Sequence, residues 1–128
     1  MKLEEIFQTV LVEEEELKRI HMSNIKDHFV QRIGDIEKGM RITEDEKFTE
    51  ILKRELKQWN DAIQDGRKSG NVSPKFKSIE NEWLVLLEVF RKYDIAARIH
   101  NRRYPKNKIR PIQERIGFVL TPSVNTEE

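Results

Sequence analysis

Residues 43–66, TEDEKFTEILKRELKQWNDAIQDG, contain the clearest helical pattern in the chain and decide its fold class. Large apolar residues recur there at spacings of three and four, which places their side chains on one face of an α-helix. They are Phe48, Ile51, Leu52, Leu56, Trp59 and Ile63. Thr43 and Glu46 fit a capping box at the start, and Gly66 fits the position just past the end. We therefore predict a helix between Thr43 and Gly66.

Two helices are predicted before this segment, at residues 3–21 and 23–38. Apolar residues follow helical spacing in both, but the step from Ile20 to Ile25 is five residues, which breaks the stripe. We place the break at Ser23, which suits the N-cap of a new helix. One bent helix running through residue 38 is the alternative, because no Gly or Pro interrupts the chain before Gly34.

Two more helices are predicted after it. Ser73 and Pro74 have the residue types of an N-cap and a first helical position, and the helical rhythm then continues to about His100. Its central stretch at 83–90, WLVLLEVF, is apolar on nearly all sides, so we expect this helix to be the most buried. A short fifth helix is predicted from Pro111 to near Gly117, followed at 118–120 by a strand or a packed arm.

The predicted fold is therefore all-α: a small helical bundle or a long antiparallel helical hairpin, with four main helices plus a short C-terminal helix. We expect residues 1–120 to form a single helical domain and residues 121–128 to form a flexible tail. Charged residues make up 37% of the chain, against roughly 25% in typical domains. This ratio suits slim amphipathic helices, or a subunit that completes its core against another chain. No stretch is apolar for the roughly 20 residues that a bilayer requires, so we expect a cytoplasmic protein that does not contact membranes.

The residues that catalysis and metal binding need are missing or badly placed. There is no cysteine, no G-x-S-x-G and no G-K-[ST], which argues against nucleophilic catalysis and a phosphate-binding loop. His21 and His28 would lie about 10 Å apart along a helix, too far to share a zinc ion with bonds of about 2 Å. His100 has no metal-binding neighbours in sequence, and Trp59 and Trp83 fall on apolar faces that predict core packing. We expect no enzymatic activity, no metal and no cofactor.

The functional signal is a basic strip at residues 95–113, IAARIHNRRYPKNKIRPIQ, which holds six Arg or Lys and no carboxylate. The whole chain has a formal charge of only +1. A run of like charge repels itself unless something negative offsets it. Glu88 is expected to pair with Arg91 and Lys92, and Asp94 with Arg98, at helical spacing. The predicted contact residues are Arg98, Arg102, Arg103, Tyr104, Lys106, Lys108, Arg110 and Arg115.

Two hypotheses follow from the strip. The first is a non-enzymatic, nucleic-acid-associated subunit that contacts the phosphate backbone, with Tyr104 available to stack on a base. The second is a helical adaptor or inhibitor, in some cases homodimeric, that binds an acidic protein surface. A helix-turn-helix is disfavoured, because HNRRYPKN is longer than the usual turn and Pro111 leaves too short a second helix. The choice between DNA and RNA stays open.

Overall fold

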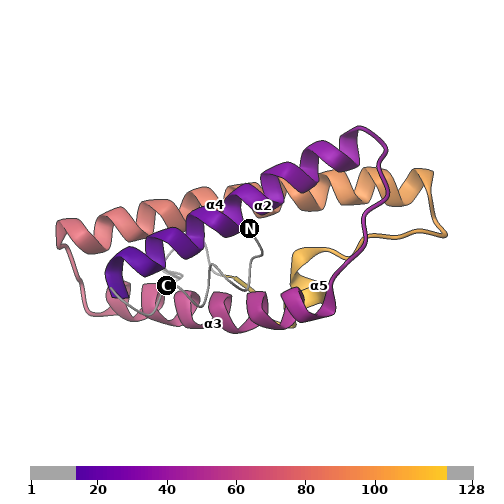
Figure 1. Cartoon of the computed structure of the whole chain (residues 1–128). Helices are drawn as coiled ribbons and strands as arrows, with labels where there is room; N and C mark the ends of the chain where they lie inside the picture. Colours follow the sequence, from indigo (N-terminus) through magenta and orange to yellow (C-terminus); the bar gives the residue numbers. More distant parts are fainter. Residues whose placement is uncertain (1–13, 121–128) are drawn as a thin grey trace.

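The computed structural model describes the backbone of residues 14–120 and the side chains of residues 22–120. Four helices cover this range: α2 (Glu14–Glu37), α3 (Glu46–Lys68), α4 (Pro74–Arg103) and α5 (Ile112–Ile116) (Figure 1). The described range contains no strand, so the all-α prediction is confirmed. The first half of the predicted helix at 3–21 and the predicted flexible tail at 121–128 lie outside the described residues.

α2 passes through the predicted break at Ser23 without interruption, so the prediction of a new helix there is wrong. Met22 fills the gap in the apolar stripe: it is 2% exposed and is followed at helical spacing by the buried Ile25 and Phe29. Ser23 is exposed on the other side. The helix ends at Glu37, and Gly39 two residues later has a φ of 77°, which supplies the left-handed conformation of a Schellman motif. The bonds of that motif join Gly39 N to Ile36 O (3.0 Å) and Met40 N to Asp35 O (2.9 Å).

The predicted capping box at the start of α3 is also wrong. Asp45 is the N-cap, and its carboxylate accepts hydrogen bonds from the backbone N–H groups of Lys47 (2.9 Å) and Phe48 (3.4 Å). Thr43 and Glu44 belong to the preceding connection. An Asp side chain caps the first turn as well as Thr does, so α3 begins two residues later than the predicted capping box implies.

The glycine that ends α3 is Gly70, with φ of 71°, and not Gly66. Gly70 N bonds to Arg67 O (3.1 Å) and Asn71 N to Gly66 O (2.9 Å), which forms a second Schellman motif. Gly66 lies inside the helix, where a Cβ atom would overlap the ring of Phe76 from α4. It therefore permits close packing instead of ending the helix.

α4 begins as the sequence predicts. Ser73 is the N-cap, its hydroxyl accepts a hydrogen bond from Phe76 N (3.2 Å), and Pro74 occupies the first turn. The helix ends at Arg103, just before Tyr104 and Pro105. The expectation that its middle is buried on nearly all sides is wrong in part, because Leu84 and Val85 are 40% and 51% exposed.

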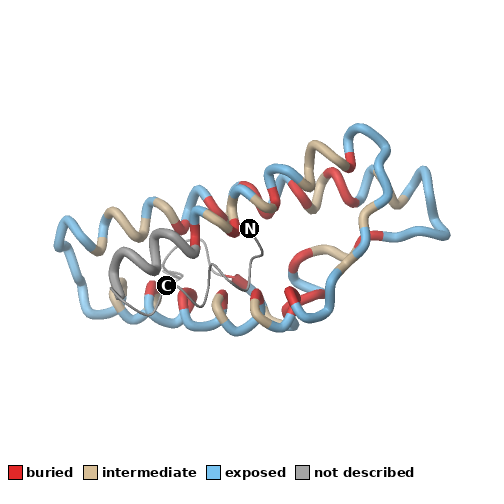
Figure 2. The backbone as a smooth tube through the Cα atoms, in the orientation of Figure 1, coloured by how far each residue is buried: buried red, intermediate tan, exposed pale blue. Residues whose placement is uncertain are grey.

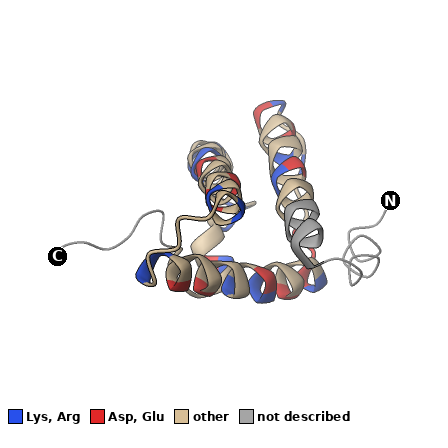
Figure 3. Cartoon of the chain, turned by 90° about the vertical axis from the view of Figure 1, so that its left-hand side faces the viewer, with Lys and Arg blue, Asp and Glu red and all other residues tan. Residues whose placement is uncertain are grey.

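The three long helices form a bundle in which α2 and α4 run side by side and in the same direction, with α3 antiparallel along one side of the pair (Figures 1 and 3). Buried residues face inward from each helix (Figure 2). At the centre, the ring of Phe29 meets Phe90 (5.1 Å) and Tyr93 (5.0 Å) edge to face. Trp59 and Trp83 are buried, which confirms their predicted role in core packing. None of the described helices combines the length and apolar composition needed to cross a bilayer.

α5 returns the chain to the core at the end of the bundle where α4 stops. The carboxylate of Asp94 accepts a hydrogen bond from Ile112 N (3.0 Å), so a side chain of α4 caps the first turn of α5. The helix ends at Gly117, with φ of 80°, as predicted. Leu120 is buried and no strand forms at 118–120, so that segment is a packed arm.

Candidate nucleic-acid interface

The basic strip divides into a half that is built into the fold and a half that faces solvent. The last turn of α4 and residues 104–108 lie at the free end of the bundle (Figure 1). Residues 109–116 then turn back, and Ile109, Ile112 and Ile116 enter the core. The position of each cation relative to this turn decides whether it is available to a partner.

Arg110 and Arg115 belong to the built-in half, so the prediction that they contact a partner is not supported by their surroundings. Arg110 Nε lies 2.7 Å from Glu44 Oε1 and its Nη2 lies 2.8 Å from Glu46 Oε2, and these carboxylates raise the pKa of Arg110. Arg115 is 8% exposed and donates from Nη2 to Thr49 Oγ1 (2.8 Å). Both residues hold the C-terminal segment to the start of α3.

The other cations of the predicted site are exposed: Arg98, Arg102, Arg103, Lys106 and Lys108. Within the described range, no carboxylate lies at ion-pair distance from any of these five side chains. Asp94 and Arg98 form no close ion pair: the Asp94 carboxylate accepts a hydrogen bond from Ile112 N, and the Arg98 charge acts on it only from a longer distance. The predicted Glu88–Arg91 pair forms with two hydrogen bonds of 3.2 and 2.8 Å.

The loop that carries these cations is held in place by hydrogen bonds. Asn101 clamps Ile109: its Oδ1 accepts from Ile109 N (2.7 Å) and its Nδ2 donates to Ile109 O (2.9 Å). His100 Nε2 lies 2.9 Å from Asn107 O. Since a carbonyl oxygen only accepts, Nε2 carries a proton. A turn bond from Asn107 N to Tyr104 O (3.0 Å) completes the loop. The exposed charges therefore sit on a positioned scaffold.

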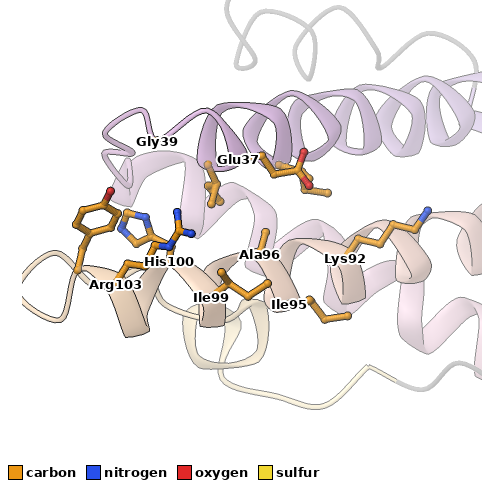
Figure 4. A pocket seen from close by; sticks show the side chains of 11 residues that line it. Glu37, Gly39, Lys92, Ile95, Ala96, Ile99, His100 and Arg103 are labelled. Carbon is orange, nitrogen blue, oxygen red and sulfur yellow. The ribbon is translucent and has the colours of Figure 1, made fainter.

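A groove of about 390 Å³ runs between the C-terminal halves of α2 and α4. Its floor is apolar and includes Ile36, Ile95 and Ile99. Figure 4 shows Lys92 at one end, and His100 and Arg103 at the end near Gly39. The groove thus combines an apolar interior with cationic ends, and the exposed Glu37 lines its α2 side (Figure 4).

A second hollow, of about 480 Å³, adjoins the groove between residues 39–46 and the Tyr104–Lys108 loop. The two share Gly39, His100 and Tyr104. Arg41 lies on the wall of the second hollow together with Lys108 and is exposed. Sequence reasoning missed Arg41, because only the fold brings the 39–46 connection next to the end of α4. The sequence feature that could have pointed to Arg41 is its place in the loop directly after Gly39, the glycine that follows the end of α2.

The view of the opposite end of the molecule shows a different distribution of charge (Figure 3). At the opposite end of the molecule, Lys and Arg alternate with Asp and Glu along the helices (Figure 3). That alternation is typical of a solvated helix face. The contrast supports treating the end of α4 as the candidate site.

Histidine and metal chemistry are not indicated in the described part of the chain. His28 is packed against Phe29 (5.1 Å between ring centroids) and Phe48 (4.4 Å). Its pKa is lowered to about 4, mainly by burial and then by the charges of Arg32 and Arg115, so it is neutral at pH 7. The side chain of His21 lies outside the described residues. Among residues 22–120, no three His, Asp or Glu side chains come together as metal ligands would.

Comparison with known proteins gave no match: no family model, no curated protein and no solved structure is detectably similar to this chain.

Proposed function

We propose that this protein is a non-enzymatic, nucleic-acid-associated helical subunit that contacts the phosphate backbone through the end of α4 and the loop after it. The observation that carries the proposal is the group of five exposed cations, none of which has a carboxylate at ion-pair distance among the described residues. They are Arg98, Arg102, Arg103, Lys106 and Lys108. Arg98 also acts on the Asp94 carboxylate from a longer distance. The structure adds Arg41 beside Lys108.

The arrangement suits phosphate contact because the cations are positioned before a partner arrives. Arg98 and Arg102 are four residues apart on α4 and share one face of the helix. Lys106 and Lys108 follow in a loop that Asn101 and His100 hold by hydrogen bonds. A partner therefore orders only the ends of these side chains, which reduces the entropy lost on binding.

Phosphate contact predicts a steep dependence of affinity on salt. Each neutralised phosphate releases counterions, so about five contacts give a log–log slope near −4.5 on duplex DNA and near −3.5 on single strands. Fluorescence anisotropy across a salt series measures this slope. A slope near zero, or no binding at low salt, would remove the proposal.

A matched pair of variants separates the strip from total charge. The test variant replaces four strip cations with alanine: Arg102, Arg103, Lys106 and Lys108. The control variant replaces four exposed cations of α3 and the start of α4: Lys53, Arg54, Lys68 and Lys75. The test variant should lose binding and most of the salt slope, while the control keeps the slope close to that of the wild type. Equal losses in both would mean that the strip has no special role. Circular dichroism checks that both stay helical.

One observation favours a second function, a helical adaptor that binds an acidic protein surface. The groove between α2 and α4 offers an apolar floor with cationic ends. However, the apolar stripe of α2 is covered within the chain, since Met22, Ile25 and Phe29 are all buried. Binding of an acidic amphipathic peptide, with no binding of nucleic acid at low salt, would favour the adaptor.

A further inference from the structure

We infer that the groove between α2 and α4 receives an unpaired base, so that the nucleic acid recognised here is single-stranded. The inference rests on the proposed function and names its substrate class. It depends on three features: an exposed aromatic ring at the mouth of the groove, an apolar floor, and cations on both sides of the mouth.

Tyr104 supplies the aromatic ring. It is 45% exposed, although most aromatic side chains of the described range are buried or partly buried. Its ring centroid lies 5.0 Å from that of His100, at an interplanar angle of 44°. Both residues line the groove and the adjoining hollow. Exposed aromatic rings beside cations are the stacking platforms that single-stranded nucleic acids use.

The cations are placed for the phosphates on either side of a bound base. Arg103 stands in the groove at the same end as His100 (Figure 4). Lys108 and Arg41 line the adjoining hollow, on the other side of Tyr104. A strand that crosses Tyr104 therefore meets cations before and after the ring. Of the carboxylates that also line the two hollows, Glu44 and Glu46 are paired with Arg110, and Glu37 is exposed on the α2 side of the groove.

The dimensions of the groove disfavour an amphipathic helix as its occupant. The apolar floor on α4 extends from Ile95 to Ile99, which is about 6 Å at 1.5 Å per residue. A docked helix with anchors at i, i+4 and i+7 needs about 10 Å. A single base needs only one apolar recess. Duplex nucleic acid is also disfavoured, because its bases are stacked on each other and present only their edges.

The experiment compares three ligands of equal phosphate number: a single strand, the same backbone built from abasic units, and a duplex. Binding is measured by anisotropy at low salt for the wild type, Tyr104→Phe, Tyr104→Ala and Ile99→Asp. Tyr104 bonds to α4 through its backbone N–H, to His100 O (2.8 Å), and Ile99 is exposed, so these changes leave the fold intact.

The wild type should bind the intact strand roughly 5- to 100-fold more tightly than the abasic backbone, which is the effect of one stacked base. Tyr104→Phe should keep this ratio. Tyr104→Ala should reduce it to about twofold or less without weakening the binding of the abasic strand. Ile99→Asp should also reduce it, and it should weaken the binding of both strands because its carboxylate repels phosphate.

The inference and the proposed function fail in different ways. Equal binding of intact and abasic strands by the wild type, with a steep salt slope, would overturn the inference and leave backbone contact standing. If Tyr104→Ala weakens the binding of the intact and the abasic strand equally, then Tyr104 only supports the loop, and this result would also overturn the inference. If none of the three ligands binds at low salt, the proposed function fails, and the inference fails with it.

Discussion

Replacing Gly66 with alanine should destabilise this protein, although the same change inside a helix ordinarily stabilises it. Alanine has a higher helix propensity than glycine, by about 0.8–1 kcal/mol. Gly66 lies inside α3, so the backbone alone predicts a gain of that size. The structure predicts the opposite sign.

The reason is the contact between Gly66 and Phe76. A Cβ atom at Gly66 would lie 2.8 Å from Phe76 Cδ1, and closer still to Cε1 and Cζ. Carbon atoms pack at about 3.5–4.0 Å, so the ring must move by roughly 1 Å or more. Phe76 is in the first turn of α4, where its N–H bonds to the Ser73 cap, and it packs against the core. Overpacking of this kind costs about 1–3 kcal/mol, which exceeds the propensity gain.

Gly34 provides the matched control. It lies inside α2, and a Cβ atom there would meet no atom within 4 Å. Gly34→Ala should therefore stabilise the protein by about 0.5–1 kcal/mol, while Gly66→Ala should destabilise it by up to about 2 kcal/mol. Urea unfolding of both variants measures the two free energies.

A third variant tests the cause directly. In a Phe76→Ala background the ring is absent, so adding Gly66→Ala should become stabilising by about as much as Gly34→Ala. If Gly66→Ala alone stabilises as much as Gly34→Ala, then the close approach of α3 to α4 is not as described and the reasoning is refuted.

Two further predictions concern His28 and Asn101. The pKa of His28 is lowered from 6.5 to about 4, mainly by burial and also by Arg32 and Arg115, so the unfolded chain binds the proton first as the pH falls. The contribution of neutral His28 to the free energy of unfolding is fully present above about pH 6.5 and is lost as the pH falls toward 4. Because the ring is partly exposed, we expect this loss to be about 1–2 kcal/mol. Urea unfolding at both pH values should show a smaller loss in His28→Asn, and an identical loss would contradict this. Asn101→Ala should cost about 1–3 kcal/mol, because it removes both bonds to the backbone of Ile109. Hydrogen exchange at the Ile109 amide should accelerate, and unchanged protection would count against the clamp.

Local patterns predicted the helices well where the signals lie next to each other in sequence. Ser73 and Pro74 mark the start of α4, and Gly117 marks the end of α5, because capping depends on the nearest few residues. The break at Ser23 was wrong because Met22 was left out of the apolar stripe. Counting that side chain as apolar would have given one continuous helix.

The candidate site was predicted only in part, because ion pairs join residues that are far apart in the chain. Arg110 and Arg115 look like free cations in the sequence, but their partners Glu44 and Thr49 lie 66 residues away. The rule for pairs four residues apart also gave no close ion pair for Asp94, whose carboxylate accepts a hydrogen bond from Ile112 N in the folded chain while Arg98 acts on it from a longer distance. No local pattern contains this information. It becomes visible only when α5 is placed against α3 and α4.

The parallel pairing of α2 with α4 has a consequence for how the chain folds. Most up-and-down bundles join neighbours in sequence, but here Phe29 must find Phe90 and Tyr93, about sixty residues further along. Closing so long a loop costs entropy before any contact repays it, and non-local contacts slow the search for the native state. This topology therefore predicts slower refolding than is usual for a small all-helical protein.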